Sequence, residues 1–68
     1  MNNDHFIKHN QRVIHVLERL LGVVEYKSAA HWLVWSNKNF GNRKPIDMID
    51  DDHQYEKLLR ALEIMESG

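Results

Sequence analysis

Residues 4–22, DHFIKHNQRVIHVLERLLG, decide the fold of this chain. At about 100° per residue the large apolar side chains of this stretch fall on one face, which predicts an amphipathic helix. Asp4 is suited to cap the start of this helix and Gly22 to stop it. The face comprises Phe6, Val13, Leu17, Leu20 and Leu21, with Ile7 and Ile14 on one flank.

Asn10 lies at the centre of that apolar face, where an apolar side chain is expected. Two explanations fit this position. Either the first turns of the helix extend beyond the core into solvent, or the Asn10 amide forms a hydrogen bond across an interface. The sequence leaves both open.

A second helix is predicted over residues 28–36, with Ser28 as its cap. Small alanines on its inner side would let another helix approach closely. Trp35 points away from that side, and a helix that is apolar all round is either buried all round or in contact with another chain. The inner side consists of Tyr26, Ala29, Ala30 and Leu33.

Residues 37–44 are predicted to form a loop, and Pro45 suits the first position of a very short third helix. Asp50, Asp51 and Asp52 then favour a helix start, because carboxylates cap free amides there and oppose the positive end of the helix dipole. The last helix is predicted over residues 52–66, with Ile64 outside its apolar face. That face carries Tyr55, Leu58, Leu59, Leu62 and Met65.

The resulting fold class is all-α: one domain over residues 1–68, a compact bundle of four helices of which the third is very short. The 68 residues include no cysteine, which excludes disulfides and cysteine-based metal sites and fits a reducing compartment. No apolar run approaches the roughly 18 residues that cross a membrane, and the opening residues do not form a secretory signal. The chain is therefore predicted to be cytoplasmic.

The chemistry of known catalytic motifs is missing from the sequence. His5 and His9 have the i, i+4 spacing that can place two imidazoles on one metal, but no third ligand follows from spacing. There is no phosphate-binding glycine loop and no nucleophile elbow. We therefore predict no enzyme activity, no metal and no cofactor.

Charge is distributed unevenly along the chain. Residues 23–45 carry four basic side chains against one acidic (+3), whereas residues 46–68 carry two basic against seven acidic (−5). Lys38, Arg43 and Lys44 surround Phe40 in one loop, a group that can contact phosphates and stack on a base. A pI of about 6.5 and an apolar second helix nevertheless argue against duplex binding, so nucleic acid is an unlikely partner.

An ordered series of motifs resembles a known family. The residues are Ala30-His31-Trp32-Leu33, Asn37-Lys38, the stretch FGNRKPIDMI at 40–49 and the stretch LLRALEIMESG at 58–68. This series is similar to the toxin-binding domain of Xre/MbcA/ParS-like antitoxins and spans roughly residues 13–68. The resemblance implies an all-helical module that binds and inhibits a partner toxin, commonly of the NAD-consuming RES type.

The resemblance also implies where the partner binds. The inhibitory end of that family is its C-terminal segment, here Glu66, Ser67 and Gly68, which reaches toward the toxin's active site. Arg43 matches the family's loop arginine and either contacts the partner or ties the loop to the acidic helix start. Together with the exposed apolar positions, the predicted partner-binding residues are Trp35, Lys38, Arg43, Lys44, Ile64, Glu66, Ser67 and Gly68.

This chain departs from the family pattern at several positions. Ser36 stands where proline is usual, Asn42 replaces a second glycine and Lys44 replaces a capping Ser or Thr. Only some 22 residues precede the second helix, too few for the helix-turn-helix that usually accompanies this domain. The prediction is thus an antitoxin-like module that occludes a cognate toxin, as a homodimer or hetero-oligomer. The alternatives are a homodimeric structural module and a small DNA-binding regulator.

Overall fold

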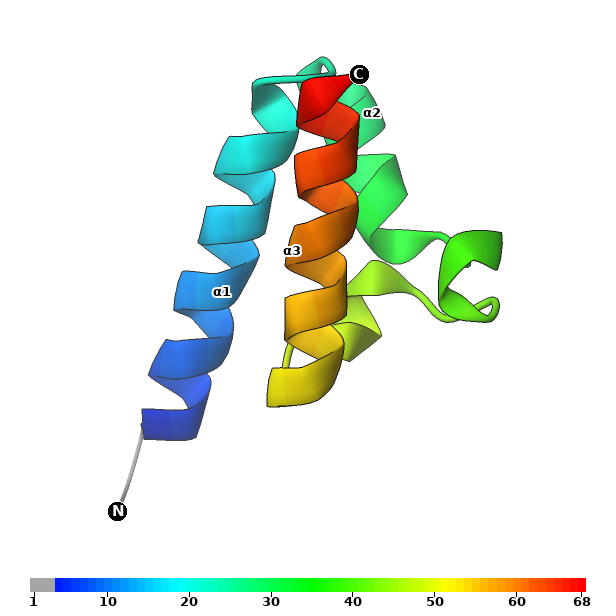
Figure 1. The fold of residues 1–68 in the computed structure, drawn as a ribbon. Helices are drawn as coiled ribbons and strands as arrows, with labels where there is room; N and C mark the ends of the chain where they lie inside the picture. Colours follow the sequence, from blue (N-terminus) through cyan, green and yellow to red (C-terminus); the bar gives the residue numbers. More distant parts are fainter. Residues whose placement is uncertain (1–3) are drawn as a thin grey trace.

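The computed structural model describes residues 4–68, which form three α-helices and two short 3₁₀ helices (Figure 1). No strand forms among these residues. The all-α prediction is confirmed, but the predicted set of four helices is not matched exactly. The short third helix is a 3₁₀ helix, and a second 3₁₀ helix lies in the segment predicted as a loop. The elements are α1 (Asp4–Leu21), α2 (Tyr26–Val34), η1 (Lys38–Phe40), η2 (Pro45–Met48) and α3 (Asp52–Ser67).

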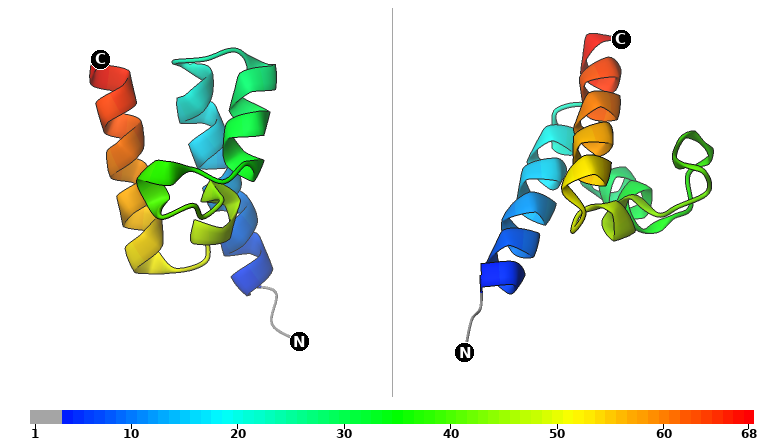
Figure 2. Two further views of the ribbon diagram at one scale, coloured as in Figure 1. Left: turned by 90° about the vertical axis from the view of Figure 1, so that its right-hand side faces the viewer. Right: turned by 60° about the horizontal axis from the view of Figure 1, so that its bottom comes forward.

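α1 and α3 lie side by side and run in the same direction (Figures 1 and 2). α2 runs in the opposite direction, from the turn that follows α1 to the loop that contains η1. α1 ends at Leu21, where the backbone N–H of Gly22 donates to the carbonyl of Arg19 at 3.1 Å. η2 begins at Pro45, whose missing N–H is not needed at a first helical position. α3 begins after Asp51, whose carboxylate accepts from the Gln54 N–H at 3.0 Å. The predicted capping role of the aspartate run is confirmed at Asp51.

The core gathers one or two buried apolar side chains from each element. Leu58 and Leu62 of α3 and Leu20 of α1 are fully buried, as their periodicity predicted. The 3₁₀ segments close one end of this core with Phe40 and Met48. Among the described residues, the core cluster consists of Val16, Leu20, Ala29, Leu33, Phe40, Met48, Ile49, Leu58 and Leu62, and Pro45 is buried as well.

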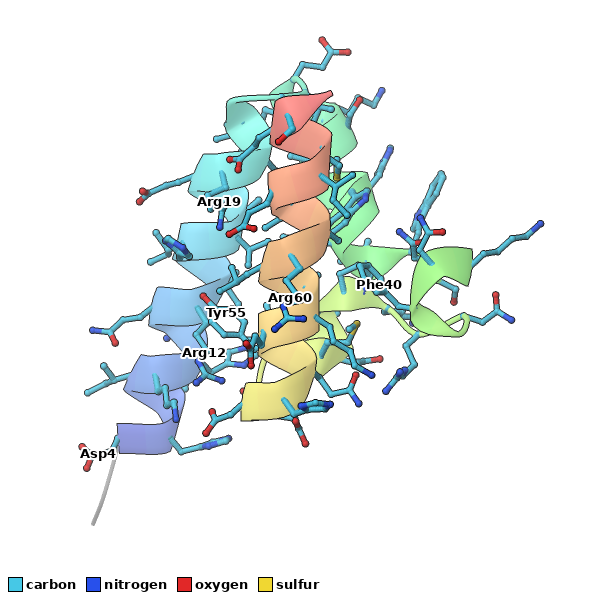
Figure 3. The ribbon with its side chains drawn as sticks, viewed as in Figure 1. Asp4, Arg12, Arg19, Phe40, Tyr55 and Arg60 are labelled. Atoms are coloured by element: carbon cyan, nitrogen blue, oxygen red, sulfur yellow. The ribbon has the colours of Figure 1, made fainter. Side chains whose placement is uncertain are left out.

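The buried face of α1 is rotated from the predicted one. Val16, which the predicted face did not include, is fully buried, whereas Phe6 and Leu21 of that face are exposed. The reason is that Arg12 and Arg19 point toward α3 instead of solvent (Figure 3). The aliphatic part of an arginine covers apolar surface while its guanidinium group makes polar contacts. A helix face that carries arginines can therefore pack against another helix, although its sequence looks solvent-exposed.

Arg12 joins α1 to the segment that follows η2 and to the start of α3. It donates through Nη1 to the Ile49 carbonyl at 2.8 Å and through Nη2 to Asp52 at 2.6 Å. Its guanidinium also lies 4.4 Å from the centroid of the Tyr55 ring. Only 15% of the Arg12 side chain is exposed, whereas the Asp52 side chain is 77% exposed, so the bond to the Ile49 carbonyl is better sheltered from water than the ion pair.

Two details of α2 differ from the prediction. Its N-cap is Glu25, which makes no capping hydrogen bond, and Ser28 lies inside the first turn of the helix. The helix begins earlier because the turn after α1 is completed at Val24, whose N–H donates to the Leu20 carbonyl at 2.8 Å. Tyr26, predicted on the inner side, is exposed because it precedes the part of α2 that packs on the core.

Candidate functional site

A groove of about 610 Å³ lies between α3 and the loop that follows α2. We call it the α3–loop groove. One wall is the outer side of α3, and the other is the segment around η1 (Figure 2). It is lined by Trp32, Asn37, Asn39, Phe40, Gly41, Arg43, Met48, Lys57, Arg60, Ala61, Ile64 and Met65.

The loop wall is built by a tight chain reversal. The backbone N–H of Asn37 donates to the Arg43 carbonyl at 3.0 Å, and the N–H of Asn42 donates back to the Asn37 carbonyl at 2.9 Å. Gly41 and Asn42 both adopt left-handed backbone conformations, with φ of 66° and 65°. Glycine and asparagine are the residues that enter this region most readily, which explains why the FGN sequence turns here.

The floor of the groove is apolar. The Phe40 ring meets the edge of the Trp32 ring at a centroid distance of 6.0 Å and an angle of 87°. Phe40 is only 7% exposed, so it serves the core and is not available to stack on a nucleic-acid base. Ile64 stands at the rim with 74% of its surface exposed, the largest value among the exposed large apolar residues described. A partner's apolar side chain would find its contacts between Ile64 and this floor.

Three cationic side chains surround the apolar floor: Arg43 from the loop, and Lys57 and Arg60 from α3. Arg43 donates through Nε to the Phe40 carbonyl at 2.9 Å. Arg60 donates to Glu56 one turn earlier at 3.1 Å, in a pair that is exposed on both sides (Figure 3). Such an exposed pair contributes little to stability, so exchanging Glu56 for a partner carboxylate costs little.

In the structure, Arg43 forms its hydrogen bond within its own loop. The sequence predicted either a partner contact or a link to the acidic helix start. Two of the three aspartates at that start instead bind α1, where Asp50 contacts His9 at 2.7 Å and Asp52 contacts Arg12. Arg43 ties the loop to itself through Phe40, and this contact uses Nε.

The predicted partner-binding residues do not form one site. Arg43 and Ile64 line the α3–loop groove, but Lys38 and Lys44 do not, although both are exposed. Trp35 is 63% exposed and stacks on His31 with centroids 4.8 Å apart and planes 8° apart. It marks a separate apolar position at the end of α2.

The predicted inhibitory end is helical up to Ser67. Glu66 accepts two hydrogen bonds from Arg19, one of them from Nε at 3.2 Å, and so joins the ends of α1 and α3 (Figure 3). This pairing lowers the pKa of Glu66 below its usual value. The Ser67 hydroxyl donates to the Glu63 carbonyl at 2.9 Å, and the Gly68 N–H donates to the Ile64 carbonyl at 3.1 Å.

Lys57 and Arg60 were absent from the predicted site. The strongly negative balance of residues 46–68 concealed them, because net charge says nothing about which face of a helix carries a cation. The spacing 57, 60 and 64 places these two cations and Ile64 on one side of a helix. That spacing, read together with the position of Ile64 outside the apolar face, is the signal that would have found them.

Comparisons of the chain with protein-family models, with curated proteins and with solved structures give no match. Among residues 4–68, no helix is long and apolar enough to span a membrane. Nor does that part of the chain bring three His, Asp or Glu side chains together in a way that could hold a metal ion. The α3–loop groove is the feature of the described residues that is best suited to bind a partner.

Proposed function

We propose that this chain is a protein-binding module of the antitoxin type, which neutralises a partner toxin by covering its active site. The observation that supports this proposal is the α3–loop groove, where an apolar floor is surrounded by three cationic side chains. Apolar anchors beside charges are typical of protein interfaces. The proposal gives the chain a binding role and no catalytic one. The resemblance described above makes an NAD-consuming toxin of RES type the first partner to test.

The groove suits a partner segment that presents an apolar side chain next to carboxylates. The apolar side chain would pack between Ile64 and the floor. Arg60 and Lys57 would then bind the carboxylates, and Arg43 retains its second and third guanidinium nitrogens for the same purpose. Charge-assisted hydrogen bonds of this kind are stronger than neutral ones.

The C-terminal residues of α3 are the second part of the proposed interface. Ser67 and Gly68 lie exposed at the end of the helix that carries Ile64. We propose that they reach toward the toxin's active site while the groove holds a neighbouring segment. Glu66 supports them indirectly, since its pair with Arg19 fixes the direction of the last turn.

Co-expression with the protein encoded next to this chain tests the proposal. If that neighbour is toxic, the wild-type chain is expected to restore growth, and the purified pair should elute together. Ile64→Glu is expected to weaken binding at least tenfold, because the added carboxylate meets an apolar surface on the partner. Ile14→Glu is the matched control, since Ile14 is an equally large exposed isoleucine on α1. No rescue and no complex with the neighbour would refute the proposal.

Two truncations distinguish a direct role of the last two residues at the toxin's active site from the role of Glu66 in holding the end of α3. Removing residues 67–68 leaves the Arg19–Glu66 pair intact, whereas removing residues 66–68 also breaks that pair. Both are expected to lower toxin inhibition with little loss of helix content. If the shorter deletion inhibits as well as the full chain, the C-terminal residues do not act at the toxin's active site.

A further inference from the structure

α1 carries a row of exposed apolar side chains on the side that faces away from α3. We call it the outer face of α1. Phe6, Ile7, Ile14 and Leu21 are exposed by 66%, 49%, 54% and 46% respectively. At about 100° per residue they fall within roughly one third of the helix circumference, about opposite the two arginines that reach α3. None of these four side chains belongs to the buried core of its own chain.

The spacing along this face is that of a helix that pairs with another helix. Ile7, Ile14 and Leu21 are seven residues apart, and Asn10 and Leu17 form a second row with the same interval. Leu17 lies at the edge of this row and is also partly buried against the core of its own chain. These are the a and d positions of a heptad repeat, which place side chains along a seam between two long helices. Within residues 4–68, α2 is only nine residues long and α3 already lies on the opposite side. No helix among residues 4–68 covers the outer face of α1.

The side chain of Asn10 favours a second copy of α1 as the helix that covers the outer face. It is exposed, and within the described residues its side chain makes no hydrogen bond. An apolar partner surface would bury its amide without hydrogen bonds, which is unfavourable. A second amide at the same height offers both a donor and an acceptor. A second α1 in parallel orientation provides that amide.

We propose that the outer face of α1 is the interface of a homodimer, in which two copies of α1 pack in parallel and their Asn10 side chains bind one another across the two-fold axis. One polar residue in such a seam fixes register and number of chains, at some cost in affinity. The seam is also short. It runs only along α1, which has 18 residues, so we expect a dimer that dissociates on dilution.

Sedimentation velocity over a wide range of chain concentrations tests the dimer. The wild-type chain is expected to dimerise, and Ile14→Glu to remain monomeric with unchanged helix content by circular dichroism. Ile64→Glu is the matched control and should dimerise like the wild type, because Ile64 lies on α3. Ile7→Glu provides a second substitution in the seam in case Ile14→Glu fails to fold. A wild-type chain that stays monomeric, or a dimer that survives both seam variants, would overturn the proposal.

Single cysteines test the register, since the chain has none of its own. Mild oxidation of Asn10→Cys is expected to give a disulfide-linked dimer, because two-fold symmetry brings the two positions together. His5→Cys, on the opposite side of the same helix, should react much more slowly. In an antiparallel pair, a mixture of Ile7→Cys and Leu21→Cys would cross-link instead. That result, or equal rates for Asn10→Cys and His5→Cys, would overturn the parallel arrangement.

Discussion

Leu62→Ala is expected to destabilise the fold strongly, whereas Ile64→Ala, two residues later on the same helix, is expected to leave it almost unchanged. Leu62 is fully buried and Ile64 is 74% exposed. Truncating a buried leucine to alanine costs about 2–5 kcal/mol, because apolar contacts are lost and a cavity remains. Exposed substitutions usually stay within about 0.5 kcal/mol.

These magnitudes matter because the whole fold is small. At about 0.05–0.15 kcal/mol per residue, a chain of this length has a free energy of unfolding of roughly 3–10 kcal/mol. A loss of about 3 kcal/mol from Leu62→Ala therefore removes a large part of it. With an m-value of about 1–2 kcal/mol/M in urea, the midpoint should fall by about 1.5–3 M.

Urea titration followed by circular dichroism at one fixed chain concentration measures both variants, since self-association would add stability that depends on concentration. Binding to the partner is measured in parallel. Ile64→Ala should keep the urea midpoint and lose affinity. A fall of more than about 1 kcal/mol for Ile64→Ala, or less than about 1 kcal/mol for Leu62→Ala, would refute the assignment of these residues to surface and core.

Three further predictions concern the loop, a cap and the charges. Gly41→Ala should cost about 1–2 kcal/mol in urea titration, because alanine is strained at this positive φ, even though no atom lies near an added Cβ. Asp51→Ala should cost about 0.5–2 kcal/mol in the same assay, because the amide of Gln54 loses its acceptor. Hydrogen bonds from Arg12 and Arg19 lower the pKa values of Asp52 and Glu66, so their stabilisation is complete above the usual carboxyl pKa and is lost as the pH falls through the lowered values. The thermal melting temperature should therefore fall as the pH drops below the usual carboxyl pKa, and it should fall less in Glu66→Gln.

The periodicity of the sequence predicted the two long helices well, because their apolar residues recur at the helical interval and their ends carry clear signals. Leu58 and Leu62 were predicted in the core and are fully buried. Pattern alone could not show which part of the broad apolar face of α1 meets the core. That depends on Arg12 and Arg19, whose partners Asp52 and Glu66 are about 40 or more residues away.

The candidate site was only partly predictable for a similar reason. Arg43 and Ile64 were named from the sequence, and both line the α3–loop groove. The groove exists only because the reversal at residues 37–43 folds back beside α3, a contact between distant segments that no local pattern reports. Lys57 and Arg60 become part of a site only because the loop lies beside them. In the sequence they are two cations in an acidic segment.

α1 and the loop that forms one wall of the α3–loop groove lie on opposite sides of α3 (Figure 1). On α3, Asp52 and Glu66 point toward α1, while Arg60 and Ile64 fall about a third of a turn away. A dimer formed through α1 therefore leaves both grooves open, and each copy can hold its own partner. The same geometry makes Ile14→Glu and Ile64→Glu reciprocal probes, because each should abolish one association and leave the other intact. If either substitution abolished both, dimerisation and partner binding would be linked through the core, and the two surfaces could not be separate sites.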